Sequence, residues 1–385
     1  MKPRTLKAWT KWLFTVVMFA CILSLSISEE VQAFSISKQS VNKKTKSSSA
    51  ILMFTGDLMC LGGQQNAAYQ KGKFNFNNSF SYVQPIFSNA DLVIGNLETL
   101  ISESNPYTYQ EKTVDGNPNC NAMESYLDAL VKAGVTTVVT ANNHSFDGGT
   151  IGIIETLEKL EEKKIAHIGT FTENKQQQYL ICEVNGIKIA ILSYTELINA
   201  RNTLPAKKVN QLISCYSKKK IEKDVKAAKK DGAEFIIAYN HWGTENTHEI
   251  TKNQQQHAKE MAEAGVDLIL GSHPHCLQKA EYIATSDGRN VLCMYSMGNF
   301  VSSMAKEINN DTIALEVVLH KNKYGVYTGS IGYYPMMVFG SYQKKSHVVM
   351  PILKQNGVDK KYEKKFCQAK ERIQKVIGTE ISMIQ

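Results

Sequence analysis

The feature that most constrains the fold of this chain is a repeated alternation of short apolar runs with amphipathic segments. Five runs are nearly continuously apolar and end at polar or glycine residues: Ile51–Thr55, Asp91–Gly95, Thr136–Thr140, Phe235–Tyr239 and Asp267–Leu270. Segments with a helical spacing of apolar residues lie between several of them: Met123–Lys132, Ile151–Glu162, Lys220–Lys230 and Gln254–Glu263. Buried strands that alternate with helices predict a layered α/β fold with much parallel pairing.

Two hairpin signals indicate that the sheets are mixed rather than purely parallel. Asn185-Gly186 separates two β-rich runs at 181–183 and 188–193, and an Asn-Gly pair favours a tight turn between antiparallel strands. A second pair of runs, 277–283 and 290–295, flanks the turn-forming segment 286–289. We therefore expect antiparallel strands beside the parallel ones.

Residues 1–33 have the order of a targeting segment. Four basic residues precede an apolar stretch from Trp12 to Ile27, and small or polar residues ending at Ala33 follow it. The apolar stretch has 16 residues, whereas a membrane-spanning helix needs about 20. Both a cleaved signal peptide and an uncleaved N-terminal membrane anchor remain open, and either one predicts an extracytoplasmic protein, secreted or anchored.

The net charge of +8 is spread over segments with different roles, so it does not indicate nucleic-acid binding. Removing 1–33 takes away four basic and two acidic residues and leaves an excess of six. Residues 34–50 are rich in serine and lysine, which predicts a flexible linker. The lysines of 218–230 suit the solvated face of a helix, with docking of a polyanion as the alternative.

The cysteines follow no recognisable framework. Apart from Cys21, which lies within the apolar stretch of 1–33, seven cysteines are scattered from Cys60 to Cys367 without any Cys-x-x-Cys pair. An odd and unpatterned set predicts neither a zinc ribbon nor a defined disulfide framework. Buried free thiols are the expectation, and one or two disulfides are the alternative.

Polar side chains follow the apolar runs at the points where we expect strands to end. In chain order these points read Gly56-Asp57, Asn96-Leu97-Glu98, Asn142-Asn143-His144, Asn240-His241 and His273-Pro274-His275. The carboxyl ends of strands in α/β sheets are where ligands collect. Carboxylate and imidazole together suit Zn²⁺, Mn²⁺ or Fe, so the pattern predicts a site for one or two divalent metal ions.

Six blocks of this sequence carry a resemblance to a known family: 55–59, 91–99, 141–149, 241–245, 271–275 and 295–300. In order and spacing they resemble the CapA family of capsule-synthesis proteins, which belongs with the calcineurin-like metallophosphoesterases. The resemblance covers roughly 51–303 and implies a four-layer α/β/β/α sandwich with mixed sheets. It leaves 304–385 as C-terminal strands and a helix, packed on the main domain.

The resemblance also implies roles for individual residues. The implied metal ligands are Asp57, Glu98, Asn143, His241, His273 and His275. Of Asn96 and Glu98, we favour Glu98 as the bridging ligand because a carboxylate bridges two cations well. Where the wider family pattern has a histidine two residues after the first aspartate, this chain has Met59, so we expect a weakened second metal position.

Catalytic and substrate-binding candidates lie between these ligands. His144 matches the imidazole that faces substrate, and Asp147 either orients it or caps the helix that starts near Gly149. The candidates for substrate contact are Asn142, Trp242 and Glu245. Trp242 is also suited to packing, and Glu245 to lining the pocket or binding a substrate ammonium group.

Two functions from different classes fit this sequence. The first is a metal-dependent hydrolase or transferase that acts on an anionic cell-surface polymer such as poly-γ-glutamate. The second is a non-catalytic component that binds metal or polymer while membrane-bound partners carry out capsule synthesis. Met59 favours the second function, whereas His144 favours the first.

Overall fold

The computed structural model describes residues 34–35, 48–172, 177–342, 345–352 and 360–384. The expected targeting segment at 1–33 and residues 36–47 of the expected linker lie outside the described residues. The first described strand is β1 (Phe34–Ser35). Strand β2 (Ser48–Leu58) begins three residues before Ile51, the expected start of the domain. Among the helices of the described residues, none combines the length and apolar character needed to cross a membrane.

The first sheet contains the N-terminal and C-terminal parts of the domain. Its strands are, in spatial order, β11 (Ala166–Ile168), β10 (Thr137–Val139), β5 (Leu92–Leu97), β2, β19 (Asp311–Asn322), β20 (Gly325–Tyr342) and β21 (Lys345–Pro351). The first four are parallel, and β19, β20 and β21 are antiparallel to their neighbours. The short strands β18 (Asn299–Val301) and β22 (Ser382–Met383) pair with β2 and β20.

The second sheet contains both predicted hairpins. Its order runs β12 (Leu180–Val184), β13 (Ile187–Thr195), β14 (Phe235–His241), β15 (Leu268–Ser272), β17 (Asn290–Met294) and β16 (Ala280–Ala284). The hairpins β12–β13 and β16–β17 are antiparallel, while β13, β14, β15 and β17 are parallel. Asn185 and Gly186 form the first turn with φ of +51° and +79°, a conformation that glycine and asparagine tolerate. The expectation of mixed sheets is confirmed.

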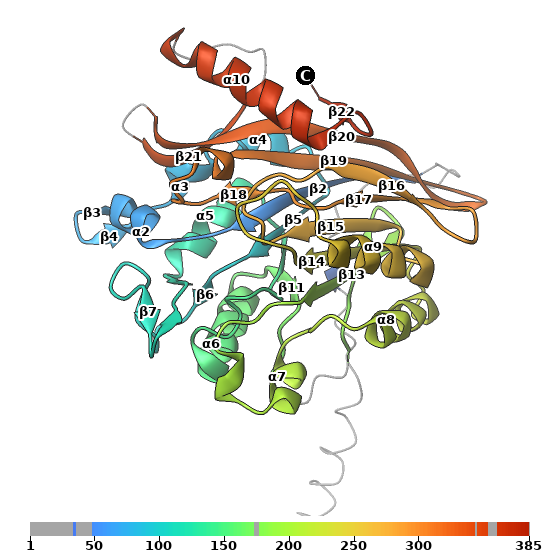
Figure 1. The fold of residues 1–385 in the computed structure, drawn as a ribbon, viewed down its shortest axis with the longest axis horizontal. Coiled ribbons are helices and arrows are strands. Elements are labelled where there is room, and N and C mark those ends of the chain that lie inside the picture. Colours follow the sequence, from blue (N-terminus) through green and yellow to red (C-terminus); the bar gives the residue numbers. More distant parts are fainter. Residues whose placement is uncertain (1–33, 36–47, 173–176, 343–344, 353–359, 385) are drawn as a thin grey trace, which may run out of the picture. The chain divides into compact units, whose positions relative to one another are not determined.

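Helices cover the outer faces of both sheets (Figure 1). On the first sheet lie α2 (Gly62–Ala68), α3 (Asn77–Phe80), α4 (Gln84–Phe87), α5 (Ser125–Ala133) and α6 (Gly149–Glu162), and α7 (Ala206–Leu212) adds to the same apolar cluster. On the second sheet lie α8 (Lys218–Lys230) and α9 (Lys252–Ala264). The remaining short elements are β3 (Tyr69–Gln70), β4 (Lys73–Phe74), β6 (Leu100–Ile101), β7 (Thr113–Val114), β8 (Asn117–Pro118), β9 (Asn121–Ala122) and two 3-10 turns at Arg201–Thr203 and Glu307–Asn309.

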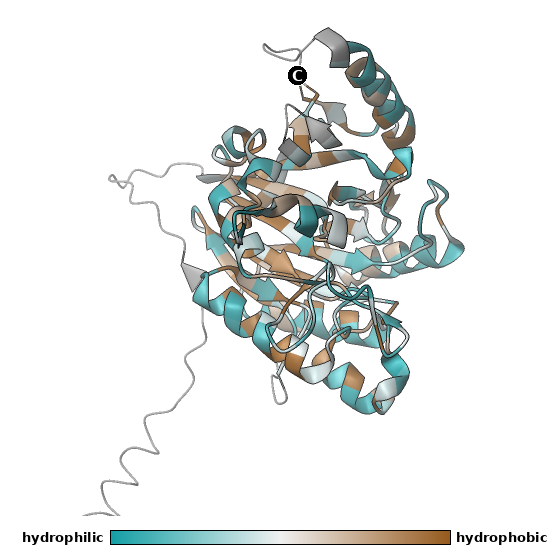
Figure 2. Cartoon of the chain, turned by 90° about the vertical axis from the view of Figure 1, so that its left-hand side faces the viewer, coloured by the Kyte–Doolittle hydropathy of each residue, from teal (hydrophilic) through white to brown (hydrophobic). Residues whose placement is uncertain are grey.

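Three apolar clusters correspond to the three interfaces between layers. The central cluster joins the inner faces of the two sheets, with Phe54 and Ile94 from the first and Ile191 and Tyr239 from the second. The other two lie between each sheet and its helices. Figure 2 shows the apolar strands enclosed by helices whose outer sides are hydrophilic. The fold is therefore an α/β/β/α sandwich with mixed sheets, as the family resemblance implies.

The C-terminal part of the chain belongs to the same core. Strand β19 pairs with β2 along most of its length, so the sheet continues across the expected boundary at 303. Helix α10 (Lys360–Ile377) contributes Phe366, Ile373 and Ile377 to the central cluster. Arg372 of α10 donates two hydrogen bonds, of 2.7 and 2.9 Å, to the Asp311 carboxylate at the start of β19.

Candidate metal centre and its surroundings

The polar strand ends of both sheets converge at one edge of the sandwich. Asp57 lies near the end of β2 and Glu98 follows β5, both in the first sheet. His241 ends β14 and His273 follows β15, both in the second sheet. All four side chains are at least 95% buried. The site therefore bridges the two sheets at the carboxyl ends of their parallel strands.

The donor atoms cluster around one oxygen of Glu98. Glu98 Oε1 lies 3.5 Å from His241 Nε2 and 3.8 Å from His275 Nε2. His241 Nε2 also lies 3.0 Å from Asn143 Oδ1 and 3.1 Å from His273 Nδ1. Two sets of donors each fall within 4.8 Å of one another: Glu98, His273 and His275, and Asp57, Glu98 and His241. The structure thus brings all six predicted metal ligands together.

The electrostatics of the cluster fit a cation. Burial, followed by the charge of Asp57, raises the pKa of Glu98 well above its usual range. Burial and the neighbouring histidines hold the pKa of His241 well below its usual range and lower that of His273 to about 3, so both imidazoles are neutral near pH 7. Glu98 Oε1 is buried and has no hydrogen-bond partner among the described residues. A divalent cation would offset the repulsion between the clustered carboxylates and would coordinate the unpartnered oxygen.

His275 differs from the other two histidines. Burial lowers its pKa, but the hydrogen bond and charge of Asp57 outweigh burial and raise it. Its Nδ1 lies 3.3 Å from Asp57 Oδ2 and 2.9 Å from Asn299 Oδ1. The backbone of the two histidines is also unusual, with φ of +96° at His273 and +56° at His275. Non-glycine residues in this region are uncommon and concentrate at functional sites.

Three polar residues support the predicted ligands: Asn96, which the sequence offered as an alternative to Glu98, and Ser272 and Asn299, which it did not place in the site. Asn96 Nδ2 donates to Asp57 Oδ1 at 2.9 Å and lies 3.5 Å from Glu98 Oε2, so it positions both carboxylates. Ser272 Oγ lies 3.0 Å from His241 Nδ1, and Asn299 Oδ1 lies 2.9 Å from His275 Nδ1. Each contact orients one imidazole ring, with its Nε2 toward Glu98. Asn96 and Ser272 lie at the carboxyl ends of β5 and β15, the same signal that pointed to the ligands, whereas Asn299 begins β18.

His144 and Asp147 form a hydrogen-bonded pair beside the cluster. His144 Nδ1 lies 2.6 Å from Asp147 Oδ2, which also accepts a 2.8 Å hydrogen bond from the Cys120 amide. Burial raises the pKa of Asp147, although His144 opposes this shift. Helix α6 has Gly148 as its N-cap, so Asp147 orients His144 and does not cap the helix. This pairing directs His144 Nε2 away from Asp147.

Cys120, His144 and Asp147 also lie close enough together to suggest a metal site. Burial is the main cause that raises the pKa of the Cys120 thiol well above its usual range. A protonated thiol is a poor metal ligand, because the thiolate is the form that binds. The three residues are better described as the His144–Asp147 pair with its backbone support.

Two of the three candidates for substrate contact have buried side chains that bond within the fold. Trp242 is fully buried in the cluster between the second sheet and its helices, where its Nε1 donates to the Tyr295 carbonyl at 2.9 Å. Asn142 is 1% exposed, and its side chain donates to Asn96 Oδ1 and the Leu97 carbonyl. Both are structural.

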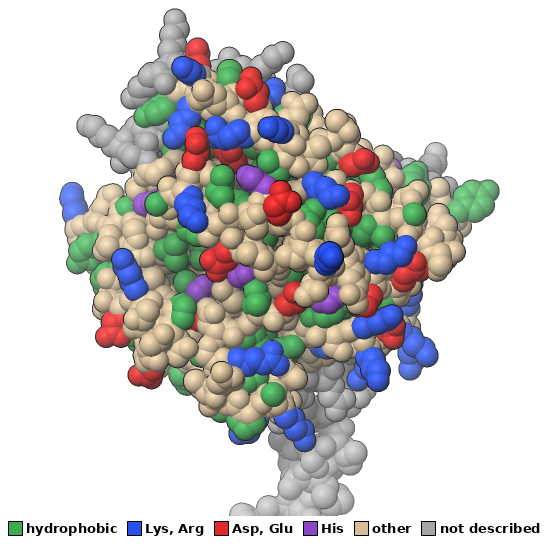
Figure 3. All heavy atoms as spheres, in the orientation of Figure 1, with side chains coloured by type: hydrophobic (Ala, Val, Ile, Leu, Met, Phe, Trp, Pro, Cys, Tyr) green, Lys and Arg blue, Asp and Glu red, His purple; other side chains and the backbone are tan. Residues whose placement is uncertain are grey.

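Glu245 is the exposed member of the three. Its charge contributes to the raised pKa values of Glu98 and His275, which places it within electrostatic range of the cluster. Figure 3 shows histidine side chains surfacing near the middle of one face, with acidic side chains beside them. Glu245 therefore remains a candidate for substrate contact.

Comparison with known proteins identifies the family. The family model described as bacterial capsule synthesis protein PGA_cap matches residues 51–304. The chain belongs to this family. It is 29% identical over 276 residues to the PGA biosynthesis protein CapA of Bacillus subtilis (strain 168), covering 71% of this chain and 68% of that protein. It is 30% identical over 247 residues to the capsule biosynthesis protein CapA of Bacillus anthracis, covering 63% of this chain and 58% of that protein.

Similar solved structures were also found for this PGA_cap family member. One is the NAD nucleotidase of Haemophilus influenzae, with a TM-score of 0.46, 13% identity, and coverage of 88% of this chain and 57% of that one. Another is the calcineurin-like phosphoesterase YfkN of Bacillus subtilis, with a TM-score of 0.46, 12% identity, and coverage of 86% and 99%. The family assignment rests on the sequence matches, and the fold on the sheet order and layers described above.

Proposed function

We propose that this capsule synthesis protein works outside the cytoplasm as a metal-dependent hydrolase on an anionic cell-surface polymer such as poly-γ-glutamate. The observation that carries the proposal is the buried, unpartnered Glu98 Oε1 at the centre of donors from both sheets. The His144–Asp147 pair next to the ligand Asn143 adds a proton donor. The match to CapA proteins supports the polymer assignment, and the sequence order of 1–33 supports export.

The residues divide into two overlapping ligand sets. On the contacts between individual donors, Glu98, Asn143, His241 and His273 would hold one divalent ion, and Asp57, Glu98 and His275 a second, with Mn²⁺, Zn²⁺ or Fe as candidates. A bound divalent cation supplies a water of lowered pKa and stabilises developing negative charge.

The chain's own groups carry the proton transfers. Asp147 accepts a hydrogen bond from His144 Nδ1 and so fixes the ring with Nε2 toward substrate. For a γ-glutamyl amide, water would add to the carbonyl carbon and release a proton to solvent. The C–N bond would break, and His144 Nε2 would give its proton to the leaving amine, so that a carboxylate and a free amine are the products. Glu245 at the exposed rim would repel a polymer carboxylate and attract an ammonium group.

A non-catalytic role in capsule assembly with membrane-bound partners is the second candidate. Met59 favours it, because this side chain stands where the family pattern supplies a histidine ligand and is 3% exposed. A site that lacks one ligand can still bind an ion and stabilise the fold without turnover.

Metal content and turnover of the purified full-length protein distinguish the two candidates. Elemental analysis should find bound Mn, Zn or Fe, and the protein should cleave a γ-glutamyl polymer or an aryl phosphodiester. His144→Ala should keep the metal and lose turnover by about 100-fold or more. Bound metal with neither substrate cleaved favours the assembly role, and absence of any bound divalent metal contradicts the site assignment.

Export is tested separately on growing cells. Added protease should degrade the protein in intact cells, and mass spectrometry of its N-terminus should distinguish cleavage near Ala33 from an intact anchor. Protection of the whole chain until the cells are lysed would contradict the extracytoplasmic proposal.

A further inference from the structure

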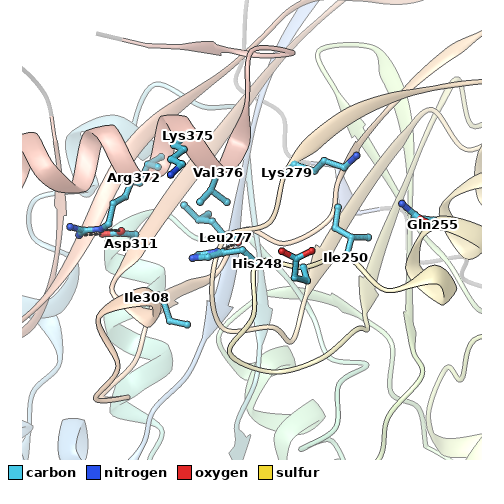
Figure 4. A pocket seen from close by; sticks show the side chains of 12 residues that line it. His248, Ile250, Gln255, Leu277, Lys279, Ile308, Asp311, Arg372, Lys375 and Val376 are labelled. Carbon is cyan, nitrogen blue, oxygen red and sulfur yellow. Dashed lines mark hydrogen bonds and ion pairs between the residues drawn. The ribbon is translucent and has the colours of Figure 1, made fainter.

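A cavity of about 600 Å³ lies between α10 and the segment that follows β14, and it contains none of the metal ligands. Figure 4 shows the side chains that line it. Leu277 and Ile373 are buried at its floor, and Ile250, Ile308 and Val376 are half-buried along its walls. The volume is within the range of small-molecule sites, and the floor is apolar.

The charged groups at the rim are unequally paired. Arg372 is held by Asp311 and lies 3.3 Å from Glu307, and Lys279 pairs with Glu281. Each of these cations already has a carboxylate partner from this chain. They therefore offer little to an occupant of the cavity.

Two other rim charges are open to a ligand. Glu249 and Lys375 both line the cavity, and no hydrogen bond or ion pair joins either side chain to any described residue. His248 lies beside Glu249, and its Nδ1 is engaged by the Leu277 carbonyl at 2.7 Å. The cavity therefore presents one unpaired negative and one unpaired positive group above an apolar floor.

This arrangement selects among classes of occupant. A purely apolar molecule would cover both charges without pairing them, which costs free energy. A simple anion would pair with Lys375 but meet Glu249, and a simple cation would do the reverse. We propose that the cavity binds a zwitterionic amino acid or short peptide with apolar side chains, its ammonium group toward Glu249 and its carboxylate toward Lys375.

Capped ligands test the charge assignment on the full-length protein. Calorimetric titration with leucyl-leucine should show saturable binding. N-acetyl-leucyl-leucine lacks the ammonium group and leucyl-leucine amide lacks the carboxylate, and each should bind about fivefold more weakly. L-leucine in the same titration distinguishes a free amino acid from a peptide as the tighter occupant.

Variants at the rim connect each ligand charge to its protein partner. In Glu249→Gln the acetyl cap should no longer weaken binding, and in Lys375→Met the amide cap should no longer do so. Glu371→Gln and Lys364→Gln change exposed charges of α10 outside the cavity and should leave both preferences unchanged. Val376→Trp should fill the cavity and abolish binding.

Three results would overturn the proposal. They are the absence of saturable binding of both leucine and leucyl-leucine, equal binding of capped and uncapped dipeptides, and cap effects that persist in the matching rim variants. All of these readouts are independent of metal and of turnover, so they distinguish this site from the proposed hydrolase function.

Discussion

Met59 is the single residue that most limits the metal chemistry of the site. It follows the ligand Asp57 by two positions, is buried, and replaces an imidazole expected from the family pattern. The ligand set of Asp57, Glu98 and His275 therefore has three protein donors and no fourth. We predict that Met59→His raises bound metal from about one to about two ions per chain, because four-coordinate sites bind more tightly than three-coordinate ones.

Elemental analysis of the purified variant measures this stoichiometry. Met59→Leu, which keeps an apolar side chain of similar volume, serves as the control and should match the original protein. A folded Met59→His protein with unchanged metal content would show that the side chain at position 59 does not reach the ligands.

The cysteines give a second prediction at this scale. The seven cysteines of the described residues are all free, and five of them are buried. Burial raises the pKa of Cys182 and of Cys276 to about 12, and that of Cys60 further. Because the thiolate is the reactive form, a raised pKa keeps these thiols protonated and slow to react even at pH 9.

Site-resolved alkylation checks this expectation. Iodoacetamide at pH 7 and pH 9 should label exposed Cys367 first and half-buried Cys215 more slowly. The five buried cysteines should react only after denaturation. Rapid labelling of Cys182 or Cys276 in the folded protein at pH 9 would contradict the burial seen here.

The location of a site residue could be predicted from the sequence where that residue lies at the end of an apolar strand. Asp57, Glu98 and His241 follow or end apolar runs in the sequence, and the structure places them at or just after the ends of β2, β5 and β14. Trp242 was a candidate for packing as well as for substrate contact, and it is fully buried. It follows His241 directly, and successive residues of an extended chain point to opposite sides. The ligand therefore points into the site, while the tryptophan points into the layer beneath the helices.

At the scale of elements, a close approach between β2 and the segment before β18 holds Asp57 in place. The Asp57 amide donates to the Gly298 carbonyl at 3.0 Å. A Cβ atom added at Gly56 would lie 1.8 Å from that same carbonyl oxygen. Only glycine fits at this position without moving one of the two backbones.

Overpacking typically costs about 1–3 kcal/mol. We predict that Gly56→Ala destabilises the protein by about 3 kcal/mol, the upper end of that range, because the clashing oxygen belongs to the backbone. Gly340→Ala is the matched control, because a Cβ at Gly340 meets nothing within 4 Å and should change stability by about 0.5 kcal/mol or less. Urea unfolding monitored by circular dichroism measures both. Equal stabilities of the two variants would contradict the close approach.

The existence of the elements was easier to predict than their partners. The apolar runs identified β2, β5, β10, β14 and β15, and the turn residues identified the two hairpins. Nothing in the local pattern of β19 indicates that it pairs with β2, which lies more than 250 residues earlier in the chain. Pairing between distant segments depends on tertiary packing. The sequence therefore predicted C-terminal strands but not the strand with which they pair.

At the scale of the whole molecule, the predicted metal ligands come from both sheets, which also meet through the central apolar cluster and through hydrogen bonds between described residues. Asp57 lies near the end of β2, and Glu98 and Asn143 follow strands of the first sheet, whereas His241 ends β14 and His273 follows β15 in the second. Tyr239 of the second sheet also donates to the Thr55 carbonyl of the first, at 2.9 Å. A bound ion would cross-link the two halves of the core.

This cross-link predicts that removal of metal lowers the thermal stability of the entire domain. A ligand that binds only the folded state at about 100 times its Kd stabilises it by about 2.7 kcal/mol. For a domain of this size that corresponds to a fall in Tm of about 5 °C after chelation. Glu98→Gln, which removes the central carboxylate, should unfold at the same temperature with and without chelator. A chelator effect that persists in Glu98→Gln would place the stabilising ion elsewhere in the molecule.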